Sequence, residues 1–279
     1  MKINEAIEFG IMELSSVETP RNYTIRLLQK VLNKDKQYLI INDNVDLLEK
    51  DERKFKEYIQ KIKLGTPLQY VTNSQSFMNI DFYVDENVLI PQPDTENLVE
   101  EVIEISKRIK VNSILDLCTG SGAIGVSIAK YMENVNVVMS DISAEALNIA
   151  KKNAILNKVD DKCSFINSDL FENINSKFDI IVSNPPYIET EEIKKLSKEV
   201  QSEPRLALDG GEDGLMFYRR IISNASMYLK DEGYLALEIG YNQSKEVQKI
   251  LENSKKFFNI YSKRDIQGIQ RIIVANSCQ

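Results

Sequence analysis

The four residues Asn184-Pro185-Pro186-Tyr187 have the clearest chemical potential in the sequence, and they directly follow the apolar run 178–183. Neither proline can donate to a sheet ladder, so the pair ends any strand before it. The Asn184 side chain and the Pro185 main chain each offer a carbonyl acceptor, and the prolines leave both with little freedom. Such acceptors would hold the N–H hydrogens of a planar amide or aromatic amine while its nitrogen attacks an electrophile, with Tyr187 stacked on the planar group. Taken alone, the tetrapeptide could equally be a strand terminator.

A glycine-rich turn, DLCTGSGAIG at residues 116–125, lies between an apolar run and a helical pattern. Its glycines let a ligand approach the backbone, and the N–H groups at the helix start point toward that ligand. Asp141 ends the next apolar run, 19 residues after Gly122, where a carboxylate can accept both hydroxyls of a ribose. Asp169 and Leu170 follow the third run. In isolation, the turn could serve helix packing alone, and an Asp at a strand end often only caps a turn.

The composition removes several kinds of chemistry. The chain has no histidine, so Ser-His-Asp and Cys-His nucleophilic schemes and histidine bases are excluded. Cys118, Cys163 and Cys278 have the spacing of neither a zinc site nor a disulfide framework, so we expect no metal and a reducing cytoplasm. No apolar run reaches the roughly 18–20 residues that cross a bilayer, and the acidic, amphipathic N-terminus does not resemble a secretory signal.

The net charge of −7 is unevenly distributed. Residues 1–75 carry 12 Lys and Arg against 11 Asp and Glu, so residues 76–279 carry 23 against 31, a net charge of −8. Proteins that bind nucleic acids usually present a basic face, because neutralisation of phosphates supplies most of their affinity. The sequence has no block of that kind, which favours a protein or small-molecule substrate.

The N-terminal part, residues 1–72, is predicted to be a small helical domain. Apolar residues recur at helical spacing in the segments 3–15 and 50–65. Thr19-Pro20 offers an N-cap and a first helical residue for a further helix. Gly65 stands where the C-terminus of a helix would be capped.

The types of residue change after this helical part. Residues 73–93 are rich in aromatic and β-branched residues around a turn-like centre, which predicts a β-hairpin linker. Asp94 or Thr95 is then expected to cap a helix. Over residues 94–279, apolar runs alternate with helical patterns, which predicts an α/β domain with an open, mostly parallel sheet covered by helices on both faces. The runs are 113–118, 135–141, 163–169, 178–184, 234–240, 257–263 and 271–277.

Asp116, four residues before Gly120, resembles the acidic residue of motif I in the S-adenosylmethionine-dependent methyltransferases. A closer resemblance comes from five segments in order: LIPQPDTENLVE, DLCTGSGAIG, SNPPYI, EPRLALDGGEDGL and LALEIGYNQ. Together they resemble the HemK/PrmC family, the peptide chain release factor glutamine N5-methyltransferases. The likeness is loose over residues 1–65 and tight from about residue 66 to residue 275.

This resemblance implies a seven-stranded Rossmann-like class I methyltransferase domain behind the helical domain and the hairpin linker. It implies S-adenosylmethionine as the cofactor, and as acceptor the side-chain amide of the glutamine in the GGQ motif of class I release factors. The helical domain would serve release factor recognition. The enzyme is expected to be cytoplasmic and monomeric, and to require neither nucleic acid nor a membrane.

Site residues are carried over from the family by position. The cofactor-binding residues would be Asp116, Cys118, Thr119, Gly120, Ser121, Gly122, Asp141, Asp169, Leu170 and Asn184. The glutamine would be held by Asn184, Pro185, Pro186 and Tyr187, of which Asn184, Pro185 and Tyr187 would be catalytic. Phe171 is expected to add apolar contact to the adenine ring, and Glu203-Pro204-Arg205 is expected to shape the acceptor side.

Two positions depart from the family pattern. Cys118 replaces the first glycine of motif I, so the backbone freedom at this position is in question. Gln92 replaces an arginine, and we assign no role to it.

Three other functions remain open. An adenine N6-methyltransferase acting on DNA or RNA would use the same acceptor chemistry, but it would be expected to bring a basic region. A dinucleotide-dependent oxidoreductase would use Gly120–Gly125 as G-x-G-x-x-G and leave Asp116 and Asn184 without a task. A non-catalytic scaffold would have no need of paired acceptors.

Overall fold

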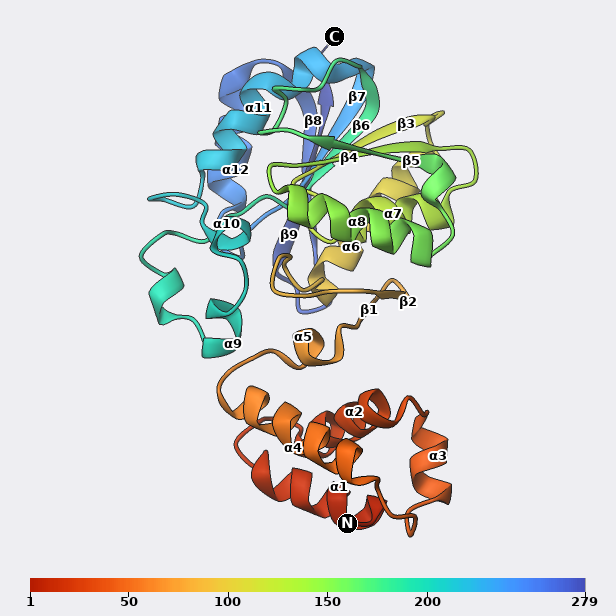
Figure 1. The fold of residues 1–279 in the computed structure, drawn as a ribbon. Coiled ribbons are helices and arrows are strands. Elements are labelled where there is room, and N and C mark those ends of the chain that lie inside the picture. The colour runs from red at the N-terminus through yellow and green to blue at the C-terminus, as the bar shows by residue number, and fades with distance from the viewer. Residues whose placement is uncertain (279) are drawn as a thin grey trace. The chain divides into compact units, whose positions relative to one another are not determined.

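Residues 1–278 are described by the structure, a computed structural model, and they form two compact units (Figure 1). Unit 1 comprises Met1–Ser74 together with Ser197–Ser202, and unit 2 comprises Gln75–Leu196 and the chain from Glu203 onward. The short helix α9 (Lys198–Gln201) therefore belongs to unit 1, although the chain before Ser197 and after Ser202 belongs to unit 2. Among the described residues, no helix is both long enough and apolar enough to span a membrane.

Unit 1 is built from helices that enclose a core of their own. These are α1 (Ile3–Glu13), α2 (Pro20–Leu32), α3 (Lys36–Ile41), α4 (Glu49–Lys63) and α5 (Leu68–Thr72). Leu27, Phe55 and Ile59 are fully buried between them. The predicted start of α2 at Thr19-Pro20 is confirmed, and so is the predicted cap at Gly65, which has a φ of +100° just after α4.

Unit 2 contains a two-stranded hairpin and a seven-stranded sheet. The hairpin pairs β1 (Gln75–Phe77) with β2 (Ile80–Phe82). The sheet has the order β5-β4-β3-β6-β7-β9-β8, in which β9 runs antiparallel to both neighbours and the other pairs are parallel. Its strands are β3 (Ser113–Leu117), β4 (Asn136–Asp141), β5 (Cys163–Asn167), β6 (Phe178–Ser183), β7 (Leu229–Glu238), β8 (Phe257–Arg264) and β9 (Gln270–Ser277). The predicted α/β class and its seven strands are thus confirmed.

Helices cover both faces of this sheet (Figure 1). One core is shared by α6 (Pro93–Ser106), α7 (Ala123–Tyr131) and α8 (Ala144–Leu156), and the other by α11 (Met216–Tyr228) and α12 (Ser244–Ser254). Alternate strand residues enter opposite cores, as Ile114 and Leu115 do, because successive side chains of a strand point to opposite faces. The short helix α10 (Arg205–Leu208) and two single 3-10 turns, 160–162 and 193–195, complete the unit.

The strand order creates a switch point between β3 and β6. The chain runs from β3 outward through β4 to β5, and then returns to β6 on the other side of β3. At the carboxyl ends of these two strands, the Ser183 hydroxyl donates a hydrogen bond of 2.7 Å to the Leu117 carbonyl oxygen. Ligands of open α/β sheets bind at such a point, because the loops leaving the two strands diverge there.

The start of α6 differs from the prediction. The N-cap is Gln92 and Pro93 occupies the first turn, so the expectation that Asp94 or Thr95 caps this helix is wrong. The physical reason is the proline, whose fixed φ suits the first helical position and whose missing N–H needs no partner there. Thr95 instead lies inside the first turn, where its hydroxyl is not used as a cap.

Asp179 of β6 joins three strands at the amino end of the sheet. It accepts hydrogen bonds from the N–H groups of Asn112 and Ser113, at 3.0 and 2.9 Å, and from Lys230 of β7, at 2.9 Å. Burial alone would raise the pKa of the Asp179 carboxyl, but these hydrogen bonds outweigh it and hold the pKa below its usual range.

We predict that Asp179→Asn lowers the free energy of unfolding by about 1.5–3 kcal/mol at pH 7, because an amide N–H would face donors. The folded pKa lies below the unfolded value of about 3.9, so the stabilisation is present above that pH and is lost as the pH falls. Urea denaturation at several pH values between about 7 and about 2 measures this, because the loss occurs below the unfolded pKa. The exposed Asp231→Asn is the control and should change stability by less than about 0.5 kcal/mol. An equal effect of the two substitutions would contradict the prediction.

Candidate active site

A cavity of about 270 Å³ lies at the carboxyl ends of the central strands. Seven of the residues predicted from the sequence line it: Cys118, Gly120, Asp141, Asp169, Leu170, Asn184 and Pro186. The other six predicted residues belong to the same loops but are not part of the lining: Asp116, Thr119, Ser121, Gly122, Pro185 and Tyr187. The structure therefore brings the glycine-rich turn, Asp141 and Asn184 to one cavity.

The Asp116 side chain holds the loop after β3 in shape. This carboxylate is fully buried. It accepts a hydrogen bond of 2.5 Å from the Thr119 hydroxyl and another of 3.0 Å from the Gly125 N–H. Burial raises the pKa of Asp116 to about 7. Because its partners are the two ends of the loop, Asp116 holds the turn in shape, and direct contact of Asp116 with a cofactor stays a prediction.

Cys118 stands where the resembled family has glycine, and its backbone has the conformation that favours glycine. Its φ is +57°, in the left-handed region that L-residues with a side chain adopt at a cost of about 1 kcal/mol. The loop thus adopts a left-handed backbone here in spite of the side chain. Burial raises the pKa of the Cys118 thiol, so the thiol is protonated near neutrality and is no nucleophile.

Asp141, at the end of β4, is aimed at this loop. One of its oxygens accepts the Gly120 N–H at 2.8 Å and the other accepts the Ser143 N–H at 3.0 Å. Burial raises the pKa of Asp141 from its ordinary value, while these N–H groups act in the opposite direction. Each carboxylate oxygen has a second lone pair, so the side chain can still accept two hydroxyl groups from a ligand in the cavity.

Asp169 and Leu170 line the cavity beyond β5, but Phe171 does not. The Phe171 ring stacks on Tyr228 at a centroid distance of 4.6 Å inside the core, so the expected contact of Phe171 with a ligand ring is wrong. The physical reason is the backbone turn at Leu170, whose φ of +49° directs successive side chains apart. Asp169 forms an ion pair of 2.9 Å with Arg220 of α11.

The tetrapeptide after β6 lies at the switch point. Pro185 and Pro186 are buried, whereas Asn184 and Tyr187 are partly exposed. The Asn184 side-chain amide donates to the Thr95 hydroxyl at 3.2 Å, and the Tyr187 hydroxyl donates to Glu238 at 3.4 Å. Since its N–H group faces Thr95, the Asn184 side chain has its carbonyl oxygen left as an acceptor for a group in the cavity.

Gln243 holds the backbone of this tetrapeptide. Its side-chain N–H group donates to the carbonyl oxygens of Tyr187, at 2.9 Å, and Gly214, at 3.2 Å, and its carbonyl oxygen accepts the Gly240 N–H at 3.0 Å. Gly210 and Gly214 pack directly on the Tyr187 backbone, since a Cβ atom at Gly210 would lie 2.7 Å from the Tyr187 Cα atom. The LALEIGYNQ and GGEDGL segments are thus both used to position the tetrapeptide.

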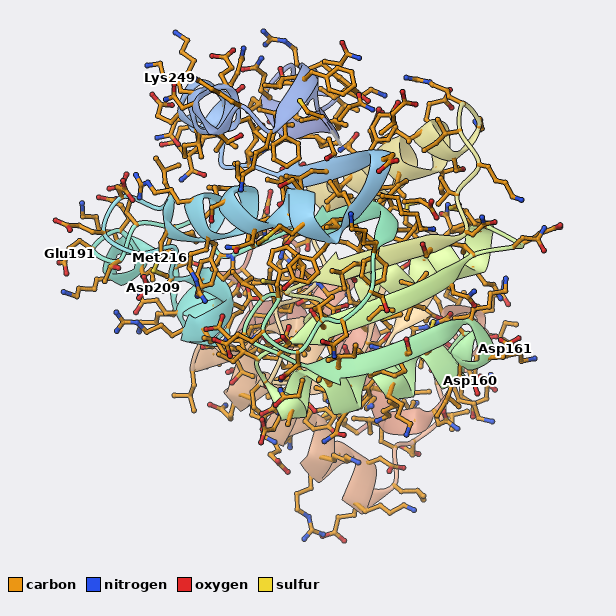
Figure 2. The ribbon with its side chains drawn as sticks, turned by 90° about the horizontal axis from the view of Figure 1, so that it is seen from above. Asp160, Asp161, Glu191, Asp209, Met216 and Lys249 are labelled. Carbon is orange, nitrogen blue, oxygen red and sulfur yellow. The ribbon has the colours of Figure 1, made fainter. Side chains whose placement is uncertain are left out.

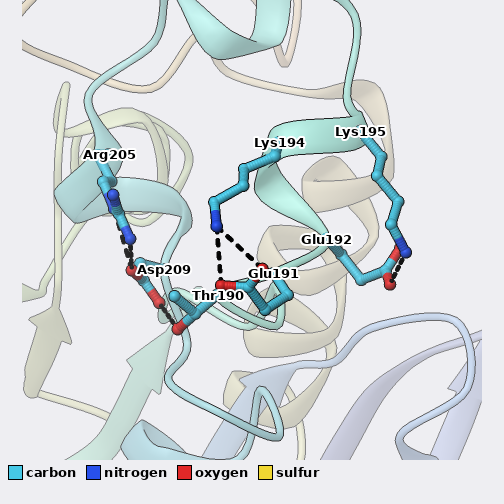
Figure 3. A network of polar contacts seen from close by, with 7 residues as sticks. All are labelled: Thr190, Glu191, Glu192, Lys194, Lys195, Arg205 and Asp209. Atoms are coloured by element: carbon cyan, nitrogen blue, oxygen red, sulfur yellow. Dashed lines mark hydrogen bonds and ion pairs between the residues drawn. The ribbon is translucent and has the colours of Figure 1, made fainter.

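The residues after Tyr187 are held by the segment that follows α10. Ile188 and Asp209 form a parallel bridge, and the Thr190 hydroxyl donates to Asp209 at 2.6 Å (Figure 3). Arg205 closes the same network with a hydrogen bond of 3.1 Å to Asp209. Beside it, the surface ion pairs Lys194–Glu191 and Lys195–Glu192 join residues three positions apart (Figure 3).

Glu203 connects two of the segments that carry the family resemblance. Its buried carboxylate accepts the Ile90 N–H at 2.8 Å, and Pro204 beside it lines the cavity. Burial raises the pKa of Glu203 to about 7. Gln92 caps α6 and donates to the Ile90 carbonyl oxygen at 3.0 Å, so it stabilises the same segment.

Several lining residues were not predicted from the sequence. They come from the segment after the hairpin, from the loop after β5, from the start of α8, from α10 and from α11: Glu86, Asn87, Leu89, Ile142, Ser143, Ala146, Ser168, Leu206, Ala207, Phe217 and Arg220. No local motif marks Phe217 or Arg220, which reach the cavity because of how α11 packs against β7 and α12. Ser143 had a usable signal, because a serine two residues after a strand-end Asp is a common helix N-cap, and the structure uses it as one.

We predict that Gln243→Ala lowers the free energy of unfolding by about 1–3 kcal/mol, because buried partners of its amide lose their hydrogen bonds. Urea denaturation at pH 7 measures the loss. Gln248 lies on the exposed side of the same helix, so Gln248→Ala is the matched control and should cost less than about 0.5 kcal/mol. If both variants were equally stable, Gln243 would not be a structural clamp.

Two known domain families match the chain. The pattern of the methyltransferase small domain matches residues 94–212, and that of the PrmC N-terminal domain matches residues 5–72. Two solved structures have a similar fold. The catalytic domain of hMettl16, in complex with an RNA hairpin, has a TM-score of 0.60 at 15% identity, covering 80% of this chain and 92% of that one. A T. thermophilus 16S rRNA methyltransferase, in complex with AdoMet and guanosine, has a TM-score of 0.52 at 20% identity, covering 73% of this chain and 49% of that one.

The full-length relatives are more similar. The release factor glutamine methyltransferase of Clostridium acetobutylicum is 42% identical over 281 residues, covering 99% of this chain and 98% of that protein. The protein of the same name from Clostridium botulinum is 37% identical over 271 residues, covering 96% and 95%. With this identity over 99% of the chain, and with residues 5–72 and 94–212 matched by domain families, the chain belongs to the release factor glutamine methyltransferase family.

Proposed function

We propose that this protein transfers a methyl group from S-adenosylmethionine to the side-chain amide nitrogen of the glutamine in the GGQ motif of class I release factors. The proposal rests mainly on the geometry of Asn184. Its side-chain N–H group donates to Thr95, so its carbonyl oxygen is left for a substrate. Asn184 and Asp141 line the same cavity. The names of the full-length relatives support the choice of acceptor.

The residues of the cavity fit S-adenosylmethionine. Each carboxylate oxygen of Asp141 accepts one backbone N–H group, from Gly120 or from Ser143. A carboxylate oxygen has two lone pairs, so each can still accept a ribose hydroxyl. A Cβ atom at Gly120 would meet nothing within 4 Å, so ligand atoms can approach the loop there. Leu170 offers an apolar surface and Asp169 a carboxylate for the adenine end. When bound, the cofactor supplies an electrophilic methyl group on a positively charged sulfur.

Asn184 and Pro185 would bind the glutamine through their carbonyl oxygens. The amide nitrogen is a poor nucleophile because its lone pair is delocalised. Acceptors on its two N–H hydrogens would orient the nitrogen and favour the positive charge that develops on it as the C–N bond forms and the bond from sulfur to the methyl carbon breaks, with the electron pair left on sulfur. The nitrogen would then lose one proton to water, because the proton is acidic at that stage, so no histidine base is needed. Tyr187, clamped by Gln243, would stack on the planar amide.

The domain assignment and the setting of the enzyme are also proposals. Residues 1–72 would recognise the release factor, residues 73–93 would connect the two domains, and residues 94–279 would catalyse methyl transfer. The match of the PrmC N-terminal domain to residues 5–72 supports a separate N-terminal domain. We place the enzyme in the cytoplasm, since its three cysteines are free thiols, as is usual in a reducing compartment. We propose that it acts as a monomer and without nucleic acid.

The proposed reaction is tested with the full chain, labelled S-adenosylmethionine and an intact class I release factor. We expect label on the release factor, none on a GGQ→GGA version, and none on DNA or RNA. Asn184→Ala should abolish transfer because the amide loses an acceptor, while the exposed Asn175→Ala should retain it. Equal labelling of the GGQ and GGA proteins would refute the glutamine, and label on DNA or RNA alone would favour an adenine acceptor.

Asp141→Ala is predicted to weaken S-adenosylmethionine binding by about 1.5–3 kcal/mol, since hydrogen bonds to a charged group are lost. Isothermal titration calorimetry measures the affinity. Asp160→Ala is the control. Asp160 is exposed and precedes β5 at the amino end of the sheet, whereas the cavity lies at the carboxyl ends of the strands. Figure 2 shows Asp160 on the other side of the view from Asp209 and Met216. Unchanged affinity in Asp141→Ala would show that the ribose assignment is wrong.

A further inference from the structure

The side chain of Asn153, on α8, is fully buried and joins two segments that lie far apart in the sequence. Its NH₂ group donates to the Tyr83 carbonyl oxygen at 2.9 Å and to the Ser121 carbonyl oxygen at 2.9 Å. Its own carbonyl oxygen accepts the Tyr83 N–H at 2.7 Å. One amide group therefore connects the segment after the hairpin to the glycine-rich loop.

The segment after the hairpin, residues 83–90, is held at both ends, and we call it the strap. At its start, Asn153 binds both backbone groups of Tyr83, and at its end, Glu203 accepts the Ile90 N–H at 2.8 Å. Tyr83 and Ile90 do not line the cavity. Between them, three residues of the strap do: Glu86, Asn87 and Leu89. The strap is thus one wall of the cavity, and it is fixed by contacts outside the cavity.

The glycine-rich loop contributes Cys118 and Gly120 to the same cavity. Helix α8 packs directly on this loop, because a Cβ atom at Gly122 would lie 3.0 Å from the Ala150 Cβ atom. Ala150 and Asn153 are three positions apart, so they lie on one face of the helix. α8 therefore supports the loop through a packing contact and through the hydrogen bond of Asn153, and the same side chain holds the strap.

These backbone partners require an amide at position 153. Two of them are carbonyl oxygens, which can only accept, and the third is an N–H group, which can only donate. An amide rotated by half a turn would place its carbonyl oxygen against two other carbonyl oxygens. A carboxylate of the same shape could accept the Tyr83 N–H, but it could donate to neither carbonyl oxygen. Asn153 therefore satisfies all three groups where Asp would satisfy one.

We propose that Asn153 is a positioning residue, which sets the separation of the strap and the glycine-rich loop and so the shape of the cavity in which S-adenosylmethionine binds. The proposal rests on the proposed function for the ligand of this cavity. Asn153 does not line the cavity, so it acts on the ligand through the backbone of Ser121 and Tyr83. Two walls that are already fixed lower the cost of ordering them when the ligand binds.

Asn157, the C-cap of α8, is the matched control within the same helix. Its NH₂ group donates to the Asp81 carbonyl oxygen of β2 at 3.0 Å and to the Asn153 backbone carbonyl oxygen at 3.0 Å. Both of its N–H hydrogens are thereby used, so neither is left for the glycine-rich loop. Asn157 thus holds the hairpin to α8, as Asn153 holds the strap, without holding the loop.

The first test is the affinity of Asn153→Asp for S-adenosylmethionine, since this variant keeps the volume and removes both donors. We expect Kd, measured by calorimetry, to rise about ten-fold or more, because two backbone carbonyl oxygens lose their partners and the walls are released. Asn157→Asp should lower stability in urea to a similar degree but keep Kd within about two-fold. In the methyl-transfer assay, Asn153→Asp should raise KM for S-adenosylmethionine and keep kcat within about three-fold, since the loop after β6 is unchanged.

The second test uses the unaltered protein, so it decides the question even if Asn153→Asp does not fold. Hydrogen exchange is followed by NMR at two backbone amides, each held by a side chain: Tyr83 N–H donates to Asn153, and Met78 N–H donates to Glu96 at 2.7 Å. Saturating S-adenosylmethionine should slow exchange at Tyr83 about five-fold or more, because the bound ligand suppresses openings that separate the walls. Exchange at Met78 should change by less than about two-fold.

The outcomes separate this inference from the proposed function. If Asn153→Asp and Asn157→Asp bind S-adenosylmethionine equally well, or if exchange at Tyr83 and at Met78 is slowed equally, the positioning role is overturned and the proposed function stands. If the unaltered protein binds S-adenosylmethionine but leaves the GGQ glutamine unlabelled, the proposed function fails. A Kd raised in Asn153→Asp and not in Asn157→Asp would still support the positioning role in that case.

Discussion

The parallel pairing of β3 with β6 is the constraint on which the candidate site depends. It places the glycine-rich loop and the Asn-Pro-Pro-Tyr loop at neighbouring strand ends, and the Ser183–Leu117 hydrogen bond joins the strands at that point. The two loops are more than 60 residues apart in the sequence. Every other feature of the cavity, from Asp141 on the next strand to α11 beside it, is arranged around this pair.

Buried carboxylates hold the segments around the cavity together. Asp116 closes the glycine-rich loop, Glu203 holds the segment before α6, and Glu238 lies behind the tetrapeptide. Burial raises the pKa of each to about 7, because a charge in an apolar surrounding is disfavoured unless hydrogen bonds compensate. Apolar residues could fill the same space, but they could not select the direction of a backbone or side-chain hydrogen bond. The site therefore combines precise orientation with sensitivity to protonation near neutrality.

The loop after β6 and the loop after β3 are held rigid in different ways. After β6, two buried prolines and the Gln243 clamp restrict the backbone. After β3, the turn needs left-handed residues, and Cys118 adopts that conformation where the family has glycine. The strain of about 1 kcal/mol is small beside the hydrogen bonds of the loop, which is why the substitution is compatible with the same geometry. This answers the question that the departure at position 118 raised.

The sequence by itself determined the fold class, the seven strands and the loops that carry the chemistry, because alternating periodicity, glycines and prolines are local signals. Seven of the residues predicted from the sequence line one cavity. Only the tertiary structure decided that Phe171 packs in the core and that Arg220 reaches the cavity. The hydrogen bond between Thr95 and Asn184 was equally hidden, since it joins residues 89 positions apart whose contact depends on how helix and strand pack. Local pattern governs which elements form, whereas the direction of a buried hydrogen bond depends on neighbours that only the fold brings together.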